Sequence, residues 1–377
     1  MTDPAGTDAR ASGVTVAVSG APPDDWPALL AAGFGAEYTH SRHWTLAAVE
    51  AWPGCRPVWL TARLAGKLVG GVAALSRPVG SSYLKGLLKI ERLESSLDGT
   101  TGGPLIRSDL APALQDRIFL DLTTAFLERR HSGPAACTLA LNRTLDVRFG
   151  SLLAQSGRWQ RHDAPTAVVD LGGGIENVAA KRLNRTKRNE RNRGLRQGAE
   201  VFATTNQDLV RSYYPLYLAA TGHWGTTPVP LEFLCRLLED PHERCFFVCV
   251  RLAGKVIGGH LNLHYGDRVF AWNGVTDPLY ARTHYPATLV FWGDMVEACR
   301  RGARWFDLGG SGGVQSLTGF KKYLGAEIEE RGFYTHESRS MAGLRTLRSF
   351  FGRFPGGGPA QRWHDRSEAR PVRRGTA

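Results

Sequence analysis

Apolar and polar positions along the chain repeat one pattern twice. Residues 63–71 read RLAGKLVGG and residues 251–259 read RLAGKVIGG, so seven of nine positions are identical. Each copy lies between two apolar, strand-like runs. We therefore predict two β-hairpins that turn at Ala-Gly-Lys, where glycine readily adopts a positive φ. The Gly-Gly pair that closes each copy allows another backbone or a ligand to approach the strand closely.

The elements around the two hairpins repeat as well. A helical pattern precedes each hairpin, and an amphipathic helix followed by a strand comes after it. The predicted elements are helices at 41–51 and 113–129 and a strand at 136–141 in the first copy, and helices at 208–220, 231–238 and 286–301 and a strand at 305–308 in the second. This alternation predicts an α/β (α+β) protein built from two copies of one module.

The chain divides into four predicted segments. They are a disordered tail at 1–13, a first module at 14–172, a second module at 173–338 that begins with a basic helix at 176–196, and a basic, largely disordered tail at 339–377. There is no apolar run of about 18 residues and no signal-peptide pattern, so we expect a cytoplasmic protein without stable membrane insertion. Six scattered cysteines without a CxxC pair indicate reduced thiols, and no residue cluster has metal-ligand spacing.

Positive charge is concentrated in two places. The formal net charge is +12. Residues 181–196 carry eight basic side chains and one acid, Glu190, and residues 339–377 carry nine arginines and two acids. Localised charge of this kind suits a polyanionic partner such as phosphate, a nucleotide or RNA. For residues 181–196, the alternative is a solvated helix between domains.

An ordered set of short motifs resembles the Fem (FemABX-like) family of aminoacyltransferases and its relatives with a doubled GNAT (Gcn5-related N-acetyltransferase) fold. The motifs are Gly258-Gly259, Gly274 to Tyr280, Pro286, the Phe306-Asp307-Leu308-Gly309-Gly310 strand end, Gly319-Phe320-Lys321, the basic stretch before Gly198, and, in the first module, Trp44 and Gly102-Gly103-Pro104. The resemblance implies two tandem GNAT-like modules, with the acceptor side on the first and the donor and transfer site on the second.

The resemblance also implies an activity: transfer of an amino acid from aminoacyl-tRNA to an amine, with formation of an amide (peptide) bond. In the Fem family that amine belongs to a peptidoglycan precursor. The chain has no heptad run for the coiled-coil arm of large Fem enzymes, which also fits a small acceptor such as an antibiotic intermediate. CoA-dependent GNAT enzymes bind the coenzyme diphosphate with a Q/R-x-x-G-x-G/A loop, whereas this chain reads RTHYPA at 282–287. We therefore expect aminoacyl-tRNA as co-substrate and no bound cofactor, in preference to acetyl-CoA or another acyl-CoA.

Aminoacyl transfer needs an amine that attacks an ester carbonyl, and a fixed cation stabilises the oxyanion that forms. By resemblance, the Phe-Lys pair contacts the donor end. The candidate catalytic residues are Lys321, Phe320, His260, His264 and Asp307. The candidate substrate-binding residues are Arg185, Arg188, Arg191, Trp44, Gly258, Gly259 and Tyr280. The alternatives are that the histidines form a solvent-facing polar row and that Asp307 caps the glycine loop after it.

Two other functions remain open from the sequence. The first is an acyl-CoA-dependent N-acyltransferase that acts on a sugar, a polysaccharide precursor or a polyamine. The second is a noncatalytic protein that binds RNA or a cell-wall precursor. No Gly-x-Ser-x-Gly motif is present and no cysteine lies beside a histidine, so covalent catalysis is not predicted.

Overall fold

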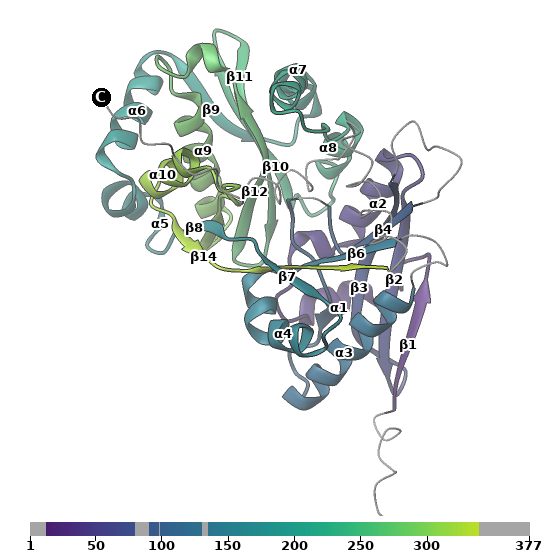
Figure 1. The fold of residues 1–377 in the computed structure, drawn as a ribbon. Coiled ribbons are helices and arrows are strands. Elements are labelled where there is room, and N and C mark those ends of the chain that lie inside the picture. The colour runs from purple at the N-terminus through teal and green to yellow at the C-terminus, as the bar shows by residue number, and fades with distance from the viewer. Residues whose placement is uncertain (1–12, 80–89, 98, 130–134, 339–377) are drawn as a thin grey trace, which may run out of the picture. The chain divides into compact units, whose positions relative to one another are not determined.

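The computed structural model describes residues 13–79, 90–97, 99–129 and 135–338, and these form two compact units (Figure 1). Unit 1 comprises the described residues up to Pro165 together with 330–338, and unit 2 comprises 166–329. The two predicted tails, apart from Gly13, lie outside the described residues.

Unit 1 is built on one sheet with helices on both faces. Within the described residues the strand order is β1-β2-β3-β4-β6-β15-β7, and the short β5 pairs with β3. The strands are β1 (Val14–Ser19), β2 (Arg56–Leu64), β3 (Lys67–Val79), β4 (Ile90–Glu94), β5 (Leu105–Ile106), β6 (Ala135–Ala140), β7 (Gln160–Asp163) and β15 (Gly332–Glu337). The helices are α1 (Trp26–Ala32), η1 (Tyr38–His40), α2 (Arg42–Ala51), α3 (Pro112–Glu128) and α4 (Arg143–Gln155). Buried Ile118 and Phe119 of α3 belong to the core with Leu60, whereas Trp26 of α1 packs edge-on against Trp59.

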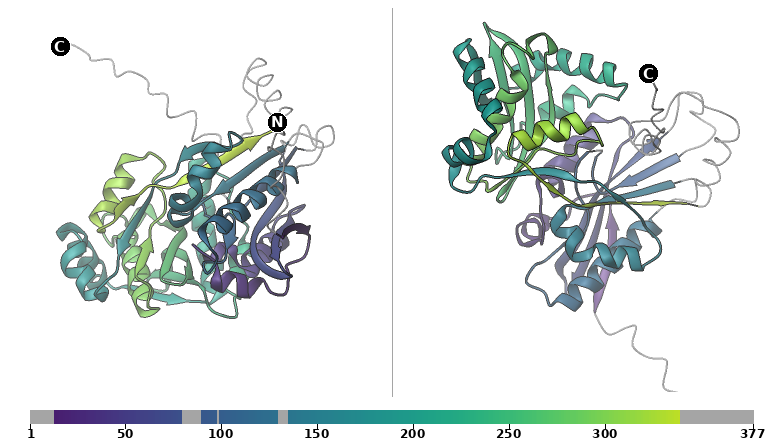
Figure 2. Two further views of the ribbon diagram at one scale, coloured as in Figure 1. Left: turned by 90° about the horizontal axis from the view of Figure 1, so that it is seen from below. Right: turned by 60° about the vertical axis from the view of Figure 1, so that its left-hand side comes forward.

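Unit 2 repeats this plan. Its strand order within the described residues is β14-β8-β13-β12-β11-β10-β9. The strands are β8 (Thr166–Asp170), β9 (Ala199–Thr204), β10 (Cys245–Leu252), β11 (Lys255–Tyr265), β12 (Arg268–Thr276), β13 (Trp305–Asp307) and β14 (Glu327–Glu329). The helical segments are α5 (Gly174–Asn177), η2 (Val178–Arg182), α6 (Arg185–Arg196), α7 (Gln207–Trp224), α8 (Leu231–Leu237), η3 (Pro278–Tyr280), α9 (Pro286–Arg300) and α10 (Gln315–Tyr323). Helices α9 and α7 lie on opposite faces of the sheet, and α6 lies outside α9 (Figures 1 and 2).

The predicted hairpin repeat is confirmed in detail. Both hairpins turn through an Ala-Gly pair with positive φ at both residues: 47° and 80° at Ala65 and Gly66, and 48° and 81° at Ala253 and Gly254. This is the backbone of a two-residue type I′ turn, whose twist matches that of the strands it joins.

The two hairpins also share a β-bulge at the same place. Strand pairing shifts by one residue immediately after Ala62 in the first hairpin and after Val250 in the second. These two residues pair with Gly70 and Gly258. The shared bulge therefore makes Gly70 and Gly258 equivalent positions of the two units.

Each unit contains one parallel strand pair, β4–β6 in unit 1 and β12–β13 in unit 2. The pairing of β13 with β12 ends at Asp307 and Phe270, but β12 continues to Thr276. The carboxyl end of β13 therefore lies beside the continuing edge of β12. The carboxyl ends of parallel strands are common ligand sites.

The predicted boundary at 172/173 is wrong in one respect, because the units exchange strands. β8 comes before that boundary, yet it pairs with β13 and β14 in unit 2. β15 follows unit 2 in the chain, yet it pairs with β6 and β7 in unit 1. Strand partners far apart in the sequence decide both assignments, and local patterns do not identify them.

Replacing Gly259 with alanine is expected to destabilise the protein by about 1–3 kcal/mol through overpacking. A Cβ at this position would overlap the buried ring of Phe247. The matched control is Gly222→Ala in α7, where an added Cβ meets nothing within 4 Å. There the higher helix propensity of alanine should raise stability slightly. Urea denaturation measures both, and a Gly259→Ala variant as stable as wild type would contradict this packing.

Candidate active site

Lys321 is a buried cation at the carboxyl end of β13. It belongs to α10, and its side chain is 3% exposed. Its ammonium donates hydrogen bonds to the carbonyl oxygens of Gly309 and Gly310, at 2.8 and 2.9 Å. Because these glycines follow β13 directly, the lysine places positive charge at the carboxyl end of β13, where pairing with β12 stops. The adjacent Lys322 is exposed, so the two lysines differ completely in environment.

Phe320 links this lysine to an aromatic cluster. Its ring centroid lies 5.8 Å from that of Phe291 in α9, and Phe291 packs edge-on against the imidazole of His260 at 4.9 Å. The Lys187 ammonium lies 4.4 Å from the centre of the Phe320 ring. Phe320 of α10 therefore packs against both α9 and α6.

His260 belongs to a buried polar triad on the side of the sheet that α9 covers. Its Nδ1 lies 2.8 Å from Oδ2 of Asp294, and Asn262 donates to Oδ1 of the same carboxylate at 2.7 Å. Asp294 and Asn262 are fully buried, and burial raises the pKa of Asp294. The alternative of a solvent-facing row is therefore wrong for His260, because α9 covers this histidine.

The structure places two other predicted catalytic residues in supporting contacts. His264 interacts through Nε2 with the carbonyl of Gly266, in the turn at the far end of β11, and burial lowers its pKa. Asp307 accepts hydrogen bonds from Thr166, Arg268 and the backbone amide of Gly309. These contacts make Asp307 a cap for the glycine loop, which is the alternative that the sequence left open.

The amides of the loop before α9 are bonded to the chain itself. The amides of Thr283, His284 and Tyr285 all donate to the carbonyl of Tyr280, and α9 begins at Pro286, which has no N–H. These bonds leave none of the three amides turned outward as an anion nest.

A carboxylate of α6 lies at the same helix end. Glu190 accepts a hydrogen bond from the hydroxyl of Thr288, the third residue of α9, at 2.6 Å, and pairs with Lys187 at 2.7 Å. Glu190 therefore places a carboxylate beside the first turn of α9, the end of a helix that attracts anions. Glu190, the only acid in residues 181–196, is thus held by specific contacts with Thr288 and Lys187.

The basic helix α6 has an inner and an outer face. On the inner face Gly194 packs so closely that a Cβ would overlap the carbonyl of His284, and Arg191 stacks on Trp292 at 4.3 Å. Arg188 donates to the carbonyls of Ala179 and Ala180. Arg188 and Arg191, both predicted to bind substrate, are thus half-buried and held by internal partners.

The outer face of α6 carries exposed positive charge. Arg185, Asn189, Asn192 and Arg196 are exposed and recur at the three- and four-residue spacing that places them on one stripe. Among the described residues, Arg185 and Arg196 make no hydrogen bond or ion pair with another side chain, and Lys181 in η2 is exposed as well.

Four other predicted binding residues serve packing. Trp44 is 1% exposed and lies edge-on to Tyr38 in unit 1, so it offers no surface to a substrate. The space above Gly258 is filled by Thr276 and that above Gly259 by Phe247. Tyr280 is half-buried, with Lys255 over its ring at 5.1 Å, and supplies the carbonyl described above.

Two functional candidates were missed from the sequence, Glu190 and Asp294. Each carried a signal: Glu190 is the single acid among eight basic side chains, and Asp294 is an acid on the apolar side of a predicted helix.

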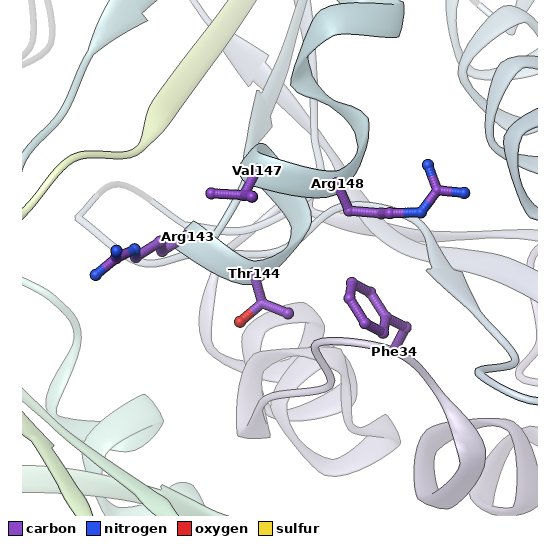
Figure 3. A pocket seen from close by; sticks show the side chains of 5 residues that line it. All are labelled: Phe34, Arg143, Thr144, Val147 and Arg148. Carbon is purple, nitrogen blue, oxygen red and sulfur yellow. The ribbon is translucent and has the colours of Figure 1, made fainter. Parts of the chain in front are cut away.

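A hollow of about 440 Å³ lies elsewhere, beside the first turns of α4 in unit 1 (Figure 3). It is lined by Phe34, Arg143, Thr144, Val147 and Arg148. Val147 is 77% exposed, so the hollow is open to solvent, and it contains no residue predicted to act in the site. Among the described residues, no group of three or more His, Cys, Asp or Glu side chains is placed to hold a metal, and no helix is long and apolar enough to cross a membrane.

The repeated topology, with a parallel strand pair in each unit, defines a fold of two tandem GNAT-like modules. A family model described as an acetyltransferase (GNAT) domain matches residues 180–322. Comparison with curated protein sequences finds no match.

Three solved structures share the fold over most of the chain. FemX is 10% identical, covers 88% of this chain and 99% of its own, and has a TM-score of 0.64. A tandem GNAT protein from the clavulanic acid biosynthesis pathway is 14% identical, covers 86% and 98%, and has a TM-score of 0.51. L-PGS from Bacillus licheniformis is 12% identical, covers 86% and 95%, and has a TM-score of 0.51. The resemblance to the Fem family is thus confirmed at the level of the fold.

The GNAT fold implies an acyl-CoA, but unit 2 does not fit its diphosphate. Such a group needs outward amides in the loop before α9, whereas the amides of Thr283, His284 and Tyr285 in this loop are bonded to the carbonyl of Tyr280. The Glu190 carboxylate at Thr288 would also repel it. No step of the chemistry below is therefore assigned to coenzyme A.

Proposed function

We propose that this chain is an aminoacyltransferase that moves an aminoacyl group from aminoacyl-tRNA to an amine and so forms an amide bond. The observation that carries the proposal is the loop before α9, whose three amides are bonded to the carbonyl of Tyr280, together with the Glu190 carboxylate beside the first turn of the helix. A GNAT-like acyltransferase without a diphosphate cradle needs an acyl donor that is held another way.

The outer face of α6 supports RNA as the carrier of that donor. Arg185, Arg196 and Lys181 present exposed charge, and phosphate contacts of this kind supply most of the affinity for nucleic acid. FemX and L-PGS share the fold. The amine acceptor is either a peptidoglycan precursor or a small natural-product intermediate.

The chemistry needs positioning and charge stabilisation. An aminoacyl ester is already activated, so the amine attacks the ester carbonyl once both are held together. Negative charge then develops on the carbonyl oxygen. In this proposal the Lys321 ammonium, fixed by two carbonyls at the end of β13, stabilises that charge.

The donor can be identified directly. Purified protein is incubated with an amine acceptor mixture and either charged tRNA or acetyl-CoA, each with and without RNase, and amide products are followed by mass spectrometry. We expect product from charged tRNA alone and its loss with RNase. Product from acetyl-CoA that survives RNase would establish the acyl-CoA alternative, and tRNA binding without any product would establish a noncatalytic binding protein.

A further inference from the structure

The triad of His260, Asn262 and Asp294 is costly to bury. His260 is 6% exposed, and the other two side chains are fully buried. A carboxylate withdrawn from water is tolerated only when it is paired and hydrogen-bonded, as Asp294 is on both oxygens. Such a group needs a structural or a functional reason.

Unit 1 shows that the fold itself does not require the triad. Since Gly70 and Gly258 are equivalent, Val72 and Ala74 stand where His260 and Asn262 stand in unit 2. Both are fully buried and apolar. The same strand thus packs against its helix without polar groups in unit 1, which favours a functional reason in unit 2.

The hydrogen bonds of the triad select one form of the histidine. Asp294 accepts from Nδ1–H of His260, and this leaves the lone pair of Nε2 as an acceptor. Asn262 donates to the second carboxylate oxygen and so prevents Asp294 from rotating. Among the described residues, Nε2 makes no hydrogen bond.

The ring extends from β11 over β12. A Cβ on Gly274 of β12 would overlap the imidazole at Cδ2 and come within 2.6 Å of Nε2, so only glycine admits the ring there. Gly274 lies beyond Phe270, where pairing with β13 ends. Phe291 and Phe320 connect the ring to the helix that carries Lys321.

We propose that Nε2 of His260 is the proton acceptor of the transfer reaction, with Asp294 and Asn262 as positioning residues. This inference rests on the proposed acyl transfer. The amine nitrogen forms a bond to the ester carbonyl carbon, and Nε2 takes the proton that the nitrogen loses. The carbon–oxygen bond to the ribose then breaks, and His260 returns that proton to the departing oxygen, so the imidazole ends neutral.

Variants of His260 and Asp294 test the proposal with whichever donor the wild type uses. His260→Gln is expected to lower kcat about 10²- to 10⁴-fold with little change in the KM for the donor. Asp294→Asn is expected to lower kcat about 10- to 100-fold with little change in KM. His223→Gln is the control, because it changes an exposed histidine of α7 that has no role in the proposed reaction, and its rate should stay near wild type.

A second measurement does not depend on any variant. The ¹⁵N resonances of His260 in the wild-type protein should show Nδ1 protonated and Nε2 unprotonated at pH 8. A proton on Nε2 in that spectrum, or a folded His260→Gln variant that keeps the wild-type rate, would overturn the inference. A wild type that forms no amide from any donor would instead refute the proposed function, and the two failures are therefore distinct.

Discussion

Replacing Lys321 with methionine is expected to lower kcat about 10²- to 10³-fold, with a much smaller change in the KM for the donor. The charge acts mainly on the oxyanion of the transition state, so binding of the ground-state ester loses little. Single-turnover rates with charged tRNA, together with filter binding of the same tRNA, separate the two quantities.

Lys321 also holds the loop at Gly309 and Gly310, so the variant should lose about 1–3 kcal/mol of stability when these carbonyls lose their donor. Thermal unfolding measures that loss. The control is Lys322→Met, which removes the neighbouring exposed charge and should leave the rate unchanged. A folded Lys321→Met protein with wild-type turnover would show that the lysine is only a loop clamp.

Removing the outer charges of α6 and η2 is expected to weaken tRNA binding on the order of 10- to 100-fold at low salt. The variant combines Lys181→Ala, Arg185→Ala and Arg196→Ala. A complex with fewer phosphate contacts releases fewer counterions when it forms. The slope of log affinity against log salt concentration should therefore become shallower by about 2–3. Binding isotherms between 50 and 200 mM salt give this slope.

Net charge alone must be excluded as the cause. The control variant replaces Arg117, Arg129 and Arg158, three exposed arginines of unit 1, with alanine, and so lowers the net charge by the same amount. Its salt slope should match wild type. Arg188→Ala should reduce stability because Arg188 caps backbone carbonyls, but it should not change the slope. Equal losses in both triple variants would refute a specific RNA-binding face.

The hairpin repeat was predictable because its determinants are local. The turn at Ala65 and Gly66 and its copy at Ala253 and Gly254 follow from the residues themselves. The faces of α6 were not predictable, because a helix with basic residues all round shows no amphipathic stripe. Long cationic side chains can lie on the inner face of α6 because they pack against aromatic rings, as Lys187 packs on Phe320.

The candidate site was also predictable only in part. Lys321 and His260 were identified as candidates, but their partners were not, since hydrogen bonds such as that from Asn262 to Asp294 join residues 32 apart in the chain. Only the fold brings these together. The strand exchange is the extreme case, because β15 pairs with a strand almost 200 residues earlier.

That exchange constrains how the protein is made. In the sheet of unit 1, β15 lies between β6 and the edge strand β7 and pairs with both. A ribosome must therefore translate as far as Glu337 before the first sheet can close. Until then the nascent chain carries open strand edges of the kind that chaperones cover, and a gene fragment truncated at codon 172 would encode a polypeptide that lacks its closing strand.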